Sequence, residues 1–114
     1  MKVLEVLQVI AAIATIATGA ISLLRPESIR GFTGLKAEGP RGITEIRAVL
    51  GGVFIALGLA PLILGAPAAY RTLGITYLVI AVVRAVSMVV DRSVVSSNII
   101  SLVVEVLFGV ILVL

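Results

Sequence analysis

The chain has 114 residues, of which 61% are hydrophobic and 13% are charged, and its formal net charge is +3. Soluble domains are about half apolar and about a quarter charged, so this composition excludes an ordinary soluble domain and a disordered chain. The sequence contains no Cys and no His, so it lacks disulfides, a thiolate nucleophile and the commonest metal ligands. We therefore expect an integral membrane protein whose partner is the lipid bilayer, with no metal, no cofactor and no nucleic acid.

Four apolar segments have the length of a membrane-spanning helix, which is about 20 residues. They cover residues 3–24, 43–64, 73–90 and 99–114. Proline cannot continue a helix interior, so Pro26 ends the first helix. Ser96, Ser97 or Asn98 is placed to cap the fourth. The sequence predicts an all-α fold, an antiparallel bundle of four transmembrane helices that forms a single domain over residues 1–114.

The connections between these segments carry the charges that predict orientation. Four spans place both termini and residues 65–72 on one side, here called side A, and residues 25–42 and 91–98 on the other, side B. Side A carries two basic residues, Lys2 and Arg71, whereas side B carries five: Arg25, Arg30, Lys36, Arg41 and Arg92. Basic residues concentrate in cytoplasmic loops, so we expect side B to face the cytoplasm in a multi-pass protein of the inner (plasma) membrane.

Small and polar residues recur on one face of every predicted helix, at the spacing of three and four that places side chains together. The stripes comprise Glu5, Gln8, Ala12, Thr15, Gly19 and Ser22; Glu45, Ala48, Gly52 and Ala56; Gly74, Tyr77, Ala81, Arg84, Ser87 and Asp91; and Asn98, Ser101, Glu105 and Gly109. Lipid cannot hydrogen-bond a side chain, so we expect all four stripes to face the interior of the bundle.

Ionisable side chains from three helices are expected to meet in the half of the membrane nearer side B. Arg84 lies six residues before the end of its segment and Glu105 six residues into the next. Both are then about 9 Å inside the boundary, and Glu45 and Arg47 lie within about 6 Å of it, at 1.5 Å per residue. A charge at depth costs about 3 kcal/mol on insertion scales. We expect pairing of Arg84 with Glu105, and with Glu45, to offset that cost.

The predicted site comprises Glu45, Arg47, Arg84, Asp91 and Glu105, with Tyr77, Ser87, Asn98 and Ser101 in support. Two interpretations stay open. The charges either form an ion-pair network that only fixes helix packing, or line a cavity open to side B that holds a polar substrate, a lipid headgroup or a proton. Residues two apart cannot share a helix face, so Arg47 is separated from Glu45 and is placed to reach the headgroups instead.

An ordered set of motifs also resembles a known family. The set is Gly-Pro-Arg-Gly-Ile-Thr-Glu-Ile-Arg-Ala at 39–48, Tyr-Arg-Thr-Leu-Gly at 70–74, Arg84 with Ser87 and Asp91, and Asn98 with Ser101 and Glu105. It resembles small bacterial four-helix membrane proteins classed as a domain of unknown function, which are distantly similar to the DoxX-like proteins. The resemblance covers nearly the whole chain and implies the four-helix architecture. DoxX-like proteins are associated with redox or quinone-linked chemistry, which this chain has no Cys or His to perform itself.

Three functions are weighed against these features. The charge cluster favours a non-catalytic membrane protein that binds a small polar ligand or lipid headgroup, alone or as an accessory subunit. The alternative is a small proton-coupled or solute transporter. It would act as a homo-oligomer, because a single bundle lacks the inverted repeats common in transporters. An enzyme is not predicted, since only carboxylate chemistry by Glu45 or Glu105 would be available. The small-residue stripes leave a homo-oligomer or a larger membrane complex open.

Overall fold

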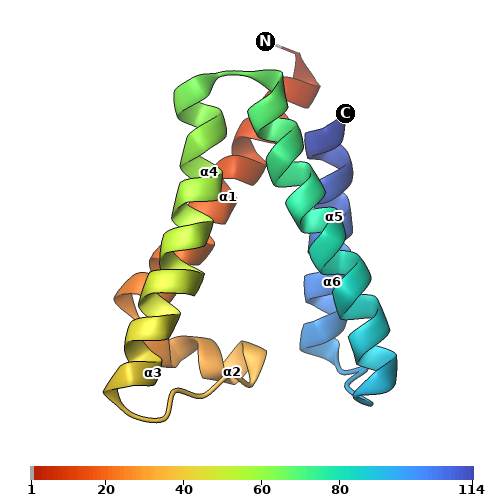
Figure 1. Ribbon diagram of the computed structural model, residues 1–114. Helices are drawn as coiled ribbons and strands as arrows, with labels where there is room; N and C mark the ends of the chain where they lie inside the picture. The colour runs from red at the N-terminus through yellow and green to blue at the C-terminus, as the bar shows by residue number, and fades with distance from the viewer. Residues whose placement is uncertain (1) are drawn as a thin grey trace.

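A computed structural model describes residues 2–114, which form helices and no strand (Figure 1). The elements are α1 Val3–Leu24, the 3-10 turn η1 Pro26–Ile29, α2 Arg30–Thr33, α3 Pro40–Glu45, the π-helix η2 Ile46–Gly51, α4 Gly52–Leu64, α5 Pro67–Val90 and α6 Ser96–Val113. Since α3, η2 and α4 run on as one helix, the described part of the chain has four helices long and apolar enough to cross a membrane. The predicted all-α fold with four such helices is confirmed.

Three of the predicted spans begin too late. The second helix begins at residue 40 instead of 43, the third at 67 instead of 73, and the fourth at 96 instead of 99. The prediction followed hydropathy and missed the first turns, where Pro40 and Pro67 are accommodated because the N–H that proline lacks has no helical acceptor there. The predicted cap of the fourth helix is also wrong, since Val95 occupies the cap position without a side-chain hydrogen bond.

The long helices pack as two antiparallel pairs, α1 with α4 and α5 with α6. Figure 1 shows the pairs close together at the top, where residues 65–66 connect α4 to α5, and spread apart towards the bottom. The top of the figure is side A, with the start of α1 and the end of α6, and the bottom is side B, where α2 lies across the open end and contacts α6. The bundle is thus splayed, and much of the side B half of each pair lacks cover from the other.

Glycines allow the backbones within each pair to touch. A Cβ added at Gly19 would lie 2.7 Å from the carbonyl oxygen of Gly51, and one added at Gly58 would lie 2.6 Å from that of Ala12. In the other pair, a Cβ at Gly74 would lie 3.0 Å from a carbonyl oxygen of α6. Lipid supplies no hydrophobic force between helices, so such close packing is a main source of their attraction.

Three of the four predicted interior stripes lie largely inside. The buried positions among them are Ala12, Thr15, Gly19, Ser22, Gly74, Ala81, Glu105 and Gly109. The stripe predicted for the second helix is wrong, because Glu45, Ala48, Gly52 and Ala56 are all exposed. The π-helix explains the difference: Ile46 and Gly51, five residues apart as in its i to i+5 spacing, are both buried.

Hydroxyl groups join the two pairs near the middle of the bundle. The oxygens of Thr15 in α1 and Tyr77 in α5 lie 2.5 Å apart. Thr15 Oγ1 donates its single proton to the carbonyl oxygen of Ala11 at 2.8 Å, so the Tyr77 hydroxyl is the donor to Thr15. Tyr77 therefore links the α5–α6 pair to α1 without leaving a polar group unsatisfied.

Tyr77→Phe is expected to lower the free energy of unfolding by about 1 kcal/mol, the worth of one interhelical hydrogen bond in a membrane protein. The effect is small because Thr15 keeps its bond to the α1 backbone and the ring keeps its edge-to-face contact with Phe108, at 5.6 Å between centroids. Reversible unfolding in mixed micelles measures the difference. Thr76→Val is the control, since the Thr76 hydroxyl bonds within its own helix. A loss above about 3 kcal/mol for Tyr77→Phe would contradict this account of the contact.

Candidate functional site

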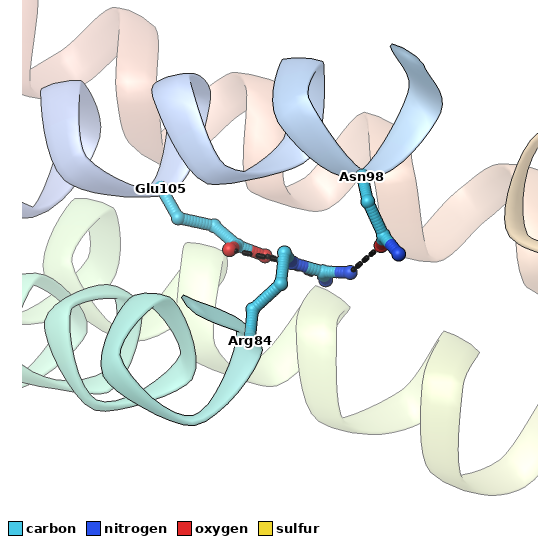
Figure 2. A network of polar contacts seen from close by, with 3 residues as sticks. All are labelled: Arg84, Asn98 and Glu105. Carbon is cyan, nitrogen blue, oxygen red and sulfur yellow. Dashed lines mark hydrogen bonds and ion pairs between the residues drawn. The ribbon is translucent and has the colours of Figure 1, made fainter. Parts of the chain in front are cut away.

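Arg84 of α5 and Glu105 of α6 form a bidentate ion pair in the side B half of the bundle (Figure 2). Arg84 Nε donates to Oε1 at 2.8 Å and to Oε2 at 3.1 Å, and Nη2 donates to Oε2 at 2.8 Å. Nη1 donates to Oδ1 of Asn98 at 2.9 Å, and Asn98 Nδ2 donates to the carbonyl oxygen of Ser93 at 2.9 Å. One guanidinium thus ties α5 to α6 and to the loop between them. Bidentate pairs of this kind are among the stronger hydrogen-bonded contacts in proteins.

The helix positions explain why the pair forms and why it is shielded. Arg84 lies six residues before α5 ends and Glu105 nine residues after α6 begins, which is about 9 Å and about 14 Å from the side B ends. Glu105 is deeper than predicted because α6 begins at Ser96. The Glu105 side chain is 10% exposed and that of Arg84 31%. Each charge at this depth is offset by the other, which lowers the cost of placing either in the membrane.

Arg84 has hydrogen-bonding capacity that these partners do not use. A guanidinium carries five N–H bonds, and the contacts above engage one on each nitrogen, so two have no acceptor among residues 2–114. The side chain forms part of the wall of a pocket of about 450 Å³. Its lining residues are Val79, Ile80, Val83, Arg84, Ser87, Met88, Asp91, Ser93 and Asn98. All of them belong to α5, to the start of α6 or to the loop between, so this pair of helices makes the pocket by itself.

Glu45 and Arg47 lie outside this network. Glu45 is paired with Arg41 on its own helix at 3.0 Å, and its side chain is 54% exposed, so the predicted pairing of Glu45 with Arg84 is wrong. The two helix pairs diverge at side B, and a partner one turn away on the same helix is available without any rearrangement. Arg47 Nε donates to the carbonyl oxygen of Leu23 at 3.1 Å, one of the last carbonyls of α1 that have no helical partner.

The remaining predicted residues have different surroundings. Ser87 and Asp91 line the pocket beside Arg84, and Asp91 is exposed just beyond the end of α5. Ser101 is half-buried on α6, between Asn98 and Glu105 in sequence. The prediction missed the carbonyl oxygen of Ser93, because a loop carbonyl leaves no mark in a pattern of side chains. In residues 2–114 no three acidic side chains come together in a way that could hold a metal ion.

A second pocket of about 530 Å³ lies at side A. Its polar lining is Lys2, Glu5, Gln8, Tyr70 and Arg71. Gln8 Nε2 donates to the carbonyl oxygen of Ile111 at 3.0 Å, whereas the three charged residues are exposed. Exposed charges and a tyrosine at the end of a span are typical of contact with the membrane surface. Arg71 is therefore a suitable control for substitutions of Arg84, since it lies on the same helix at the opposite end.

A search of the curated proteins and of the solved structures finds no match to this chain. The predicted relationship to DoxX-like proteins and the predicted bacterial origin therefore stay predictions, as does the orientation in the membrane. The family models give a match that covers almost every residue. The model described as a domain of unknown function (DUF4345) matches residues 3–114, so the protein belongs to that family.

Proposed function

We propose that the protein is a non-catalytic membrane protein that binds a small polar molecule or a lipid headgroup in the pocket beside Arg84. The observation that carries the proposal is the exposure of Arg84 to the pocket, together with its unused hydrogen-bond donors. It holds Glu105 with two donor atoms, yet its side chain is 31% exposed, has free N–H bonds and lines a pocket. An arginine that served packing alone would gain nothing from this exposure, whereas a ligand acceptor in the pocket would complete its hydrogen bonds.

Other lining residues support the same function. Ser87 follows Arg84 by three residues, and Asp91, the residue after the end of α5, follows Ser87 by four, so the three side chains continue one helix face. This face continues the one on which Tyr77 contacts α1, beyond the point where the two helix pairs separate. The pocket thus offers donors, a hydroxyl and a carboxylate on a side of the α5–α6 pair to which neither α1 nor α4 contributes lining residues. Ionisable residues are costly within membrane spans and therefore rare there, and those that are present commonly serve a function.

The test is native mass spectrometry of the protein released gently from its membrane. We expect the wild type to retain extra mass and the double variant Arg84→Met/Glu105→Met to lose it while remaining folded, because removing both charges leaves neither one stranded. Arg71→Met is the matched control, with one arginine removed at the opposite end of the same helix, and it should retain the extra mass.

Two outcomes would overturn the proposal. Bare wild-type protein, with nothing lost in the double variant except stability, would assign the ion pair to helix packing alone. Proton-driven flux in reconstituted vesicles that Glu105→Gln abolishes would instead identify the protein as a carrier. With Glu105→Gln added to the variants above, one set of proteins decides between binding, packing and transport.

A further inference from the structure

The lining of the pocket beside Arg84 changes from apolar to polar along the helix axis. Val79, Ile80 and Val83 lie seven to eleven residues before the end of α5, which places them about 10 to 17 Å inside the side B end. The polar lining lies nearer that end and comprises Arg84, Ser87, Asp91, Ser93 and Asn98, and the one apolar lining residue there is the buried Met88. A lipid in the side B leaflet has the same order, with its acyl chains towards the membrane centre and its headgroup at the boundary.

The pocket is also open to the bilayer. Its lining residues come only from α5, the start of α6 and the loop between them, so none of α1, α2 and α4 closes the pocket. Val79 and Val83 are 56% and 59% exposed, and in a membrane such side chains contact acyl chains. A lipid can therefore reach the pocket by moving sideways within its leaflet, without passing through water.

The charges of the pocket select among headgroups. Glu105 is neutralised by Arg84, whose two unused N–H bonds suit a phosphate oxygen. Asp91 is exposed and forms no ion pair with any of residues 2–114, so its carboxylate is available to a cation. A headgroup with phosphate alone would leave Asp91 facing like charge, and a quaternary ammonium has no N–H to donate to it. A phosphate joined to a primary ammonium satisfies both residues.

From this complementarity we propose that the ligand is an aminophospholipid, held by its phosphate at Arg84 and by its ammonium group at Asp91. The inference rests on the function proposed above and names the substrate class of that site. The acyl chain lies along Val79 and Val83, the ammonium donates to the Asp91 carboxylate, and the phosphate accepts from Nη1 and Nη2 of Arg84.

The test uses the whole protein in nanodiscs of equal parts phosphatidylethanolamine, phosphatidylcholine and phosphatidylglycerol, followed by native mass spectrometry of retained lipid. We expect the wild type to retain phosphatidylethanolamine over phosphatidylcholine by about tenfold, the effect of one charge-assisted hydrogen bond at a partly exposed site. Asp91→Asn should abolish this preference while still retaining phospholipid, because Arg84 is intact. Glu27→Gln, the same change of charge at side B but outside the pocket, should keep it.

The outcomes separate this inference from the function on which it rests. Wild-type protein that retains no lipid and no polar molecule would overturn both. Retained lipid without a preference for phosphatidylethanolamine, or with one that Asp91→Asn leaves unchanged, would overturn the aminophospholipid alone. Soluble phosphoethanolamine is the final arm: if it displaces the lipid at equal concentration, the acyl chain contributes nothing and the ligand is a free polar molecule.

Discussion

Glu105→Ala is expected to lower the free energy of unfolding by about 3 kcal/mol, the lower end of the cost of stranding a buried charge, because the Arg84 side chain is only partly buried. Three of the hydrogen bonds of Arg84 end on the Glu105 carboxylate, and its only other acceptor is Asn98 among residues 2–114. The guanidinium lies too deep to exchange that carboxylate for bulk water at no cost. Unfolding by denaturing detergent, followed by circular dichroism, measures the difference.

The control for this variant is the charge-free double variant Arg84→Met/Glu105→Met. Replacing both members of a buried pair by apolar residues of similar size is often neutral, so we expect it to recover most of the loss. A double variant as unstable as Glu105→Ala would show that the lost stability came from packing at this position and not from a stranded charge.

Gly58→Ala is expected to cost about 3 kcal/mol, at the upper end of the usual range for overpacking. The added Cβ would lie 2.6 Å from the carbonyl oxygen of Ala12 and 3.0 Å from the backbone nitrogen of Ile16, so α1 and α4 would have to move apart along their whole contact. Backbone atoms cannot turn away as a flexible side chain does. The same unfolding measurement applies.

Gly52→Ala is the matched control on the same helix. A Cβ at Gly52 has no atom within 4 Å, and the backbone there is helical, so the substitution is expected to leave stability unchanged or raise it by up to about 1 kcal/mol. Equal losses in the two variants would contradict the assignment of Gly58 to the buried face and of Gly52 to the exposed one.

The glycines of the second helix illustrate which features of helix packing the sequence predicts and which it does not. The spacing of small and polar residues in α1, α5 and α6 identifies faces that are largely buried, because those helices keep a constant period over their length. In the second helix the π segment changes the period between Ile46 and Gly51, and no residue in that segment marks the change. Gly51 and Gly52 are the same residue type in sequence, and only their surroundings separate them: a Cβ at Gly51 would lie 3.2 Å from Leu23, whereas one at Gly52 has no atom within 4 Å.

In the candidate site, too, the sequence predicts some contacts and not others. The depths of Arg84 and Glu105 follow from counting along two helices joined by a short loop, and that count places the two side chains within reach of each other. Glu45 lies at a comparable depth, but depth says nothing about direction, and its helix belongs to the pair that diverges at side B. The sequence offers Asn98 both as one of three possible caps of the fourth helix and as a site residue, and its side chain contacts Arg84 and Ser93 instead of capping the helix.

The single short connection between the two helix pairs also has a mechanical consequence. α5 contains 24 residues, so its far end lies about 36 Å from the connection at 1.5 Å per residue. A rotation of α5 by about 5° at that connection displaces the far end by about 3 Å, roughly the diameter of a water molecule. The pair is geometrically a long arm whose covalent connection is at side A, and the Tyr77 hydroxyl and the contact of α2 with α6 are its links farther along. Arg84 and its pocket lie towards the end of the lever arm, where a small angular difference gives the largest change in the distance between the two pairs.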